Sequence, residues 1–199
     1  QALYTNTGGA NNVALGRQAM YDNTTGTNNV AIGIQALENN TTASNNIAIG
    51  PYALKANTTG TSNVIIGYEA GEANTADNNT AVGYKALEVC STGHDNTCIG
   101  RQTLVSLTTG TKNTALGTSG QGVTTGDNNT FIGYNAGSAA SPSGNVQTED
   151  NHFVLGDDNT AFLYCADTSI SSSDSRDKSD ITNFTPGLGW IKSLRPVTY

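Results

Sequence analysis

The stretch Asn28-Asn29-Val30-Ala31-Ile32-Gly33 decides the fold, because close copies of it recur along most of the 199-residue chain. Each copy ends in an aliphatic residue followed by glycine, and the spacing between successive glycines is short and nearly constant. A fixed short period of this kind is typical of repeat architectures, in which each copy forms one structural unit. The glycines in register are Gly16, Gly33, Gly50, Gly67, Gly83, Gly100, Gly117 and Gly133, and a ninth, degenerate copy ends at Gly156.

Four positions of the repeat hardly vary. Asparagine stands four residues before the glycine, a β-branched residue three before it and an aliphatic residue one before it, and His152 replaces the asparagine in the ninth copy. The last two positions share one face of an extended strand, and the small residue between them, usually alanine, faces the other way. We expect a strand buried on both faces, with the alanine face against another chain.

Each glycine is followed by a second short segment, such as Tyr84-Lys85-Ala86-Leu87, and then by a polar turn, such as Asn57-Thr58-Thr59-Gly60. These patterns predict one coil built of strand, glycine turn, second short strand and polar turn. Two breaks within every repeat exclude a helix. A single coil buries too little to offset its ordering entropy, so stacking must stabilise it through backbone ladders and asparagine side chains. We therefore expect a homo-oligomer.

The repeat divides the chain into three regions. Residues 1–139 are expected to form solenoid coils that continue before Gln1, since residues 1–3 match residues 18–20. Residues 140–167 hold an insertion and the degenerate last repeat. Residues 168–199 form a serine-rich junction and the start of another domain. The predicted fold is an all-β solenoid or β-roll of about nine coils, followed by a short mixed α/β segment.

Composition excludes several classes of partner. The net charge is −7, and charged residues make up only 13% of the chain, so no basic stripe is available for nucleic acid. No apolar run approaches the roughly 20 residues of a membrane span. Cys90, Cys98 and Cys165 are odd in number and lack metal-ligand spacing, which argues against a disulfide framework. Cys98 stands at an alanine position and is interpreted as a small buried residue.

Acidic residues were considered as catalytic groups and as ligands. Glycoside hydrolysis needs two carboxylates that face one groove. Glu38, Glu69, Glu72, Glu88, Asp95 and Asp127 are interpreted as lying in different registers, so no pair is predicted. Asp157-Asp158, Asp127-Asn128-Asn129 and Asp77-Asn78-Asn79 offer oxygen ligands of the kind that calcium uses, but turn hydrogen bonding explains them more simply. No metal and no cofactor is predicted, and His94 and His152 are interpreted as structural.

The hexapeptide copies resemble the head repeats of trimeric autotransporter adhesins, and they are equally similar to repeats in phage tail-fibre proteins. The resemblance covers residues 1 to about 160 and implies a left-handed parallel β-roll made by three chains, hence a homotrimer. The period departs from the adhesin pattern, since it is longer than the adhesin repeat.

The end of the chain carries a different signature. Residues 173–178 read Ser-Asp-Ser-Arg-Asp-Lys, apolar residues follow at 188, 191 and 194, and residues 194–199 read Leu-Arg-Pro-Val-Thr-Tyr. Alone, residues 174–178 are typical of a solvated charged turn. Together, these elements resemble the start of the intramolecular chaperone domain of endosialidases and phage tail spikes. That resemblance implies a domain that trimerises the fibre and then cuts its own chain.

The resemblance assigns roles to individual residues. It makes Ser173 the nucleophile and Lys178 its base, with scission between Ser173 and Asp174, because a serine hydroxyl needs a base to become reactive. The residues that the motif implies to be structural are Arg176, Arg195, Pro196 and Tyr199. This is single-turnover serine peptidase chemistry and not substrate turnover. The sequence reaches Tyr199 soon after Ser173, so we expect that most of such a domain is absent from it.

The sequence therefore predicts a virion tail-fibre or spike segment, a trimeric shaft that contributes to attachment to a host-surface receptor or glycan. Its expected partners are two further copies of itself, the host receptor and other virion tail proteins, with no nucleic acid and no membrane insertion. The ligand-binding residues are not predicted. Two alternatives stay open, the head of a trimeric bacterial surface adhesin and a tail spike that depolymerises glycans.

Overall fold

The computed structural model describes residues 1–141 and 143–160, and this part of the chain contains nine short strands and no helix. The strands are β1 (Val13–Leu15), β2 (Val30–Ile32), β3 (Ile47–Ile49), β4 (Val64–Ile66), β5 (Thr80–Val82), β6 (Thr97–Ile99), β7 (Thr114–Leu116), β8 (Thr130–Ile132) and β9 (Phe153–Leu155). Every strand coincides with the three residues before a repeat glycine. The predicted positions of the strands are thus confirmed.

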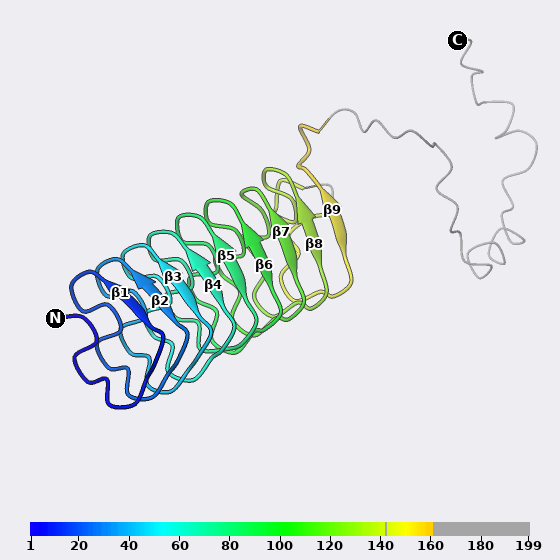
Figure 1. The fold of residues 1–199 in the computed structure, drawn as a ribbon. Helices are drawn as coiled ribbons and strands as arrows, with labels where there is room; N and C mark the ends of the chain where they lie inside the picture. Colours follow the sequence, from blue (N-terminus) through cyan, green and yellow to red (C-terminus); the bar gives the residue numbers. More distant parts are fainter. Residues whose placement is uncertain (142, 161–199) are drawn as a thin grey trace, which may run out of the picture. The chain divides into compact units, whose positions relative to one another are not determined.

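All nine strands form one parallel sheet in the order β1 to β9, so each strand pairs with those of the preceding and following coils (Figure 1). The pairing keeps the sequence register, since Ala31 lies opposite both Ala14 and Ala48. Successive coils therefore stack directly on one another, as in a β-solenoid. This fold class is the predicted one.

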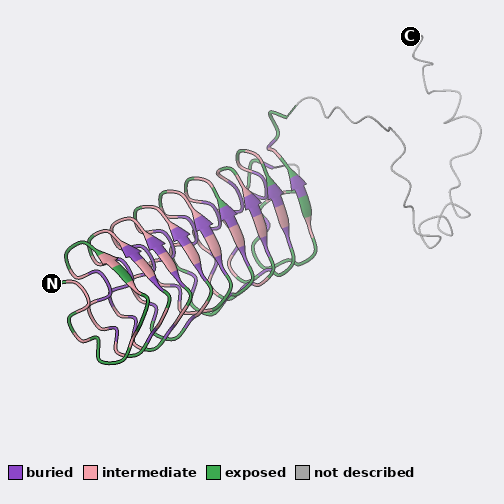
Figure 2. Cartoon of the chain, in the orientation of Figure 1, coloured by how far each residue is buried: buried purple, intermediate pink, exposed green. Residues whose placement is uncertain are grey.

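The interior of the coil corrects the prediction for the two strand faces. The central strand residues, such as Ala31, Ala48 and Ala81, are fully buried, whereas the flanking residues of β2 to β8 are partly or more fully exposed (Figure 2). The alanine face therefore points into its own coil and is not a surface for another chain. So short a coil encloses little space, and small side chains fit where the strand approaches the opposite wall.

Larger interior residues are accommodated where a neighbour is reduced to glycine. Phe131 takes the central position of β8, and it lies beside Gly120 and Gly137. A Cβ on Gly137 would collide with the Phe131 ring, and Gly71 similarly makes room for Ile65 in β4. A larger side chain at one interior position is thus compensated by a glycine at the position it contacts, so that the interior stays close-packed.

The repeat glycine is required by close backbone approach. Gly33 has a φ of 137°, and a Cβ there would lie 2.5 Å from the backbone carbonyl of Gly50 in the next coil. No larger residue fits this step without moving the neighbouring coil. The glycine period therefore sets the spacing at which coils can stack.

The segment after each glycine is not a second strand, so that prediction is wrong. It is a series of turns in which Gln35 and Leu37 have φ values of 55° and 52°. Two residues in the left-handed region so close together bend the chain away from an extended course. Adjacent coils still hydrogen-bond here, for example from Leu37 N–H to Ala53 C=O at 3.0 Å.

Buried asparagines connect the coils, as predicted. The N–H of Asn46 donates to Asn29 Oδ1 at 2.9 Å, and its Nδ2 donates to the Gly60 carbonyl at 2.9 Å. The N–H of Asn63 then donates to Asn46 Oδ1 at 3.0 Å. Each asparagine therefore links two neighbours: its backbone N–H bonds to the coil before it, and its side chain bonds to the coil after it. No buried side-chain nitrogen or oxygen within the described ranges lacks a hydrogen-bond partner.

A second interior ladder was not predicted. Asn23, Asn40, Asn57 and Asn74 lie seven residues after their glycines and are fully buried, and Asn40 Nδ2 donates to Asn23 Oδ1 at 2.7 Å. The equivalent places in later coils hold Cys90, Leu107, Val123 and Val146. Cys90 and Cys98 are buried and free, in agreement with the interpretation of Cys98.

Candidate functional site

The outward face of the sheet is one candidate functional surface. The residue before each glycine is aliphatic throughout, and Leu15, Ile99 and Ile132 are 66%, 44% and 37% exposed. Three residues before the glycine, the row begins with Val13, Val30, Ile47 and Val64, continues with Thr80, Thr97, Thr114 and Thr130, and ends with Phe153. The sheet thus presents regularly spaced apolar side chains on the outside of the single chain.

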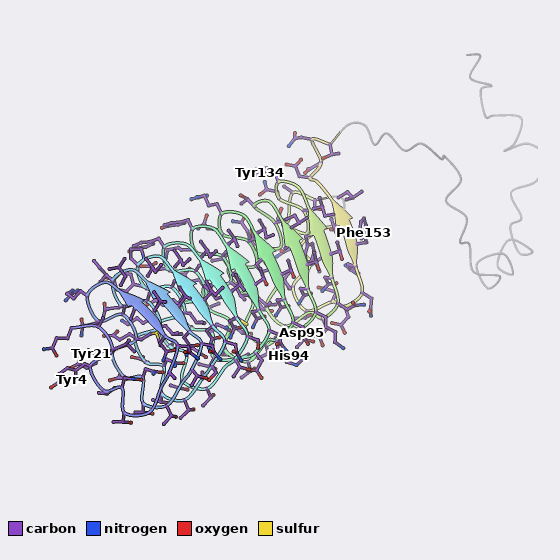
Figure 3. All side chains as sticks on the ribbon, viewed as in Figure 1. Tyr4, Tyr21, His94, Asp95, Tyr134 and Phe153 are labelled. Atoms are coloured by element: carbon purple, nitrogen blue, oxygen red, sulfur yellow. The ribbon has the colours of Figure 1, made fainter. Side chains whose placement is uncertain are left out.

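Tyrosines line up beside the sheet. The rings of Tyr68 and Tyr84 stack with centroids 5.7 Å apart, and Tyr52 meets Tyr68 edge-on at 5.9 Å. The Arg101 guanidinium lies 5.8 Å from the Tyr84 ring. The rings of this row therefore contact their neighbours in adjacent coils, face to face for Tyr68 and Tyr84 and edge to face for Tyr52 and Tyr68. Tyr4 and Tyr21 stack at one end of the solenoid, and the exposed side chains of Tyr134 and Phe153 belong to the other end (Figure 3).

A charged cluster adjoins this row. Lys85 Nζ lies 2.9 Å from Glu69 and 2.7 Å from Glu88, and one carboxylate oxygen from each of Glu69, Glu72 and Glu88 lies within 4.8 Å of the other two. Hydrogen bonding to Lys85 lowers the pKa of Glu69, and hydrogen bonding to Glu69 raises the pKa of Lys85. The hydrogen bond between Tyr68 and Glu69 raises the tyrosine pKa. Within the described residues, no basic side chain lies within 4.0 Å of Glu72.

The cluster shows that the sequence interpretation of these acids is wrong. Glu72 and Glu88 both lie five residues after a repeat glycine, as does Glu38, so the stacking brings them to one edge. The shared offset from the repeat glycine is the signal in the sequence that would have predicted that these glutamates lie together. Lys85 and Glu69 likewise share the second position after the glycine.

The cluster is poorly suited to acid catalysis. Glycoside hydrolysis needs one protonated carboxyl group with a raised pKa. Lys85 has the opposite effect on Glu69, because it stabilises the ionised carboxylate. Three carboxylates are also a ligand set for a hard cation, but Lys85 already lies between two of them.

The other acidic groups singled out from the sequence serve turns and coil contacts. Asp77 Oδ1 accepts the N–H of Thr61 at 2.6 Å, and Asp127 Oδ1 accepts that of Thr111 at the same distance. Asp157 accepts the N–H of Asn159 at 3.1 Å, which is an Asx turn.

The two histidines also lie in turn regions. His94 Nδ1 is 2.9 Å from the adjacent Asp95 carboxylate on the exposed surface, and this contact lowers the pKa of Asp95 (Figure 3). The backbone N–H of His152 donates to Asn129 Oδ1 at 2.8 Å and so continues the asparagine ladder.

The residues predicted for self-cleavage lie outside the described part of the chain, as does Cys165. They are Ser173, Asp174, Arg176, Lys178, Arg195, Pro196 and Tyr199. Their roles stay predictions from the sequence.

Comparisons with protein-family models, with curated proteins and with solved structures found no match to this chain. Across the described ranges, no helix is long and apolar enough to cross a membrane.

Proposed function

We propose that this chain is a shaft segment of a virion tail fibre, in which three copies associate through the outer faces of their sheets. The observation that supports the assembly is the apolar outer face of the sheet, where Ile99 and Ile132, in strands with neighbours on both sides, are 44% and 37% exposed and the flanking residues of the other inner strands are partly exposed. Covering this row on assembly contributes a favourable free energy of about 25 cal/mol for each Å² of apolar surface removed from water. The row also contains no charged side chain, so no unpaired charge opposes the contact.

A second copy of the same chain is the best occupant of this face. The sheet repeats at each coil, so an identical rod can match it coil by coil along the whole length. The glycine step and the asparagine ladder that runs through both halves keep the strands of this face in register. A partner with another period would lose this match after a few coils. Trimerisation and attachment to a host-surface glycan or receptor follow from the sequence resemblance, and the apolar face agrees with such an assembly.

The test of assembly is the solution mass of residues 1–160, measured by light scattering and sedimentation. We expect a trimer. Ile49→Glu places a charge at the centre of the outer face and is expected to dissociate it. Thr59→Glu introduces the same charge at an exposed turn and should leave the mass unchanged. A wild-type chain that is a stably folded monomer contradicts the proposal.

The C-terminal residues add a self-processing step to the proposal. Ser173, with Lys178 as base, promotes hydrolysis of the bond between Ser173 and Asp174 once the trimer has formed, so that one water is consumed, Ser173 ends in a carboxylate and Asp174 begins with an amino group. Expression with the natural downstream sequence should give a shortened chain, and Ser173→Ala should remain full length by mass spectrometry. An uncut wild-type chain contradicts self-processing but leaves the trimeric shaft intact. A cut also favours the tail fibre over a bacterial adhesin head, which is the alternative that shares the same repeats.

A further inference from the structure

A groove of about 380 Å³ runs across four successive coils beside the charged cluster. Its lining includes Ala56 and Ala73, which lie six residues after their glycines, and the same position holds Asn39 before them and Val89 after them. The two alanines lower the surface between larger neighbours, and this local change in size creates the groove. Its length follows the stacking direction, at about 4.8 Å for each coil.

The polar lining offers both donors and acceptors. Lys55 Nζ has a long contact of 3.8 Å to Glu38 and lies 5.5 Å from the centroid of the Tyr52 ring, so its ammonium group keeps N–H donors for a ligand. The Glu72 carboxylate lines the groove without an ion-pair partner among the described residues, whereas Glu88 is held by Lys85 at 2.7 Å. Donors and acceptors therefore stand above an apolar floor and repeat with the coils.

Backbone N–H groups along the groove are already paired. Ala56 N–H donates to Glu72 C=O at 2.9 Å, and Ala73 N–H donates to Glu88 C=O at 3.0 Å. An extended peptide that adds as a strand needs both N–H and C=O groups of its neighbour, and these two N–H groups are already used. The groove is therefore better suited to recognition through side chains and the alanine methyl groups.

We infer that this groove binds a neutral or N-acetylated oligosaccharide lying along the fibre axis. Sugar hydroxyls donate to the Glu72 carboxylate, sugar oxygens accept from Lys55 and Asn39, and the C–H face of a ring rests on Ala56 and Ala73. Two carboxylates in the lining disfavour acidic sugars. The inference rests on the proposed attachment function and gives it a site and a class of ligand.

The experiment uses residues 1–160 on an array of neutral, N-acetylated and acidic bacterial oligosaccharides of four or more sugars, followed by calorimetric titration with the strongest binder. We expect binding to a neutral or N-acetylated chain. Glu72→Gln replaces the charged carboxylate acceptor with a weaker neutral amide, one of whose two positions is now a donor, and should weaken binding about ten-fold or more. Ala73→Leu fills the floor and should abolish binding. Ala140→Leu, an equal change at an exposed turn, serves as the control and should bind like the wild type.

The outcomes separate this inference from the proposed function, because the mass of each sample is measured as well. A trimer that binds no sugar on the array contradicts the proposed sugar site in the groove but does not contradict the proposed trimeric shaft. Binding by Glu72→Gln and by Ala73→Leu that is as strong as wild-type binding also overturns the inference, as does a preference for acidic sugars. Binding lost on adding a chelator assigns Glu69, Glu72 and Glu88 to a cation and contradicts direct recognition.

Discussion

The coils that contain β1 to β4 and those that contain β5 to β8 share one backbone but place their apolar groups differently. In the first half, the outer row holds Val30 and Ile47, while Asn40 and Asn57 lie inside. In the second half, threonines take the outer row, while Leu107 and Val123 move inside. One outer position and one inner position thus exchange polarity near the middle of the solenoid, while the outer residue before each glycine stays aliphatic.

This exchange shows how one repeat can solve its stability problem in two ways. A coil of the first half satisfies buried amides by hydrogen bonds along the stack and keeps its apolar residues for an external partner. A coil of the second half buries its own apolar side chains and exposes hydroxyl groups. The first half should therefore depend more on assembly, and the second half should be more stable as a single chain.

The asparagine ladder four residues before the glycine runs through both halves, and breaking it is expected to have the largest effect. Asn63→Leu removes a buried amide that donates to Asn46 and Ala76 and accepts from the N–H of Asn79. We expect a loss of about 3–5 kcal/mol, because several buried groups lose their partners together. Urea unfolding at fixed protein concentration measures it. Asn113→Leu should cost the same, and a much smaller loss there would contradict a shared ladder.

The second ladder distinguishes the halves. Leu107→Asn places an amide between Cys90 and Val123, which offer it no ladder, and should cost about 2 kcal/mol. Adding Val123→Asn should recover part of this loss, because the two amides then bond to each other. Urea unfolding of the single and double variants gives the comparison. Additive losses would show that the ladder cannot be extended into the second half.

The sequence was sufficient to predict the coils, the nine strand positions and the asparagine contacts, because each depends on a residue type repeated at a fixed period. It failed where the outcome depends on the shape of one coil. Alternation along β3 separates Ala48 from Ile47 and Ile49 but does not tell which side is enclosed. The turns after the glycine were also missed, since residues such as Leu37 rarely adopt positive φ. Glu69 and Glu88 meet only through stacking, so their offsets from the glycine had to be compared between coils.

Substitutions in the outer row, three residues before the glycine, are expected to change the association of the three chains by a smaller amount. Thr97→Val makes the second half resemble the first and should tighten the trimer, whereas Val30→Thr should loosen it. Each change alters about one methyl group for each chain, or on the order of 1 kcal/mol. Sedimentation across a range of concentrations measures both. Equal association of the two variants would mean that the outer row does not form the interface.

The smallest expected effect concerns the junction of the two halves, where Glu69 in the coil after β4 meets Lys85 in the coil after β5 at 2.9 Å. The folded-state pKa of Glu69 lies below its usual value, chiefly because Lys85 bonds the ionised form. The resulting stabilisation is fully present above the unfolded pKa of about 4.3 and is lost as the pH falls through the lower folded value. The melting temperature of the wild type should therefore exceed that of Glu69→Gln at pH 7, and the difference should shrink as the pH is lowered toward 3.

Solvent partly screens this contact, because the Lys85 and Glu69 side chains are 25% and 19% exposed, so the difference in melting temperature should be small and should shrink further in high salt. Glu72→Gln removes a neighbouring carboxylate that has no ion pair among the described residues, and it serves as the control. Its melting temperature should not fall below that of the wild type at pH 7. If the difference for Glu69→Gln persisted at pH 3, it would arise from packing and not from the charge, and the junction would be held by its tyrosine stack instead.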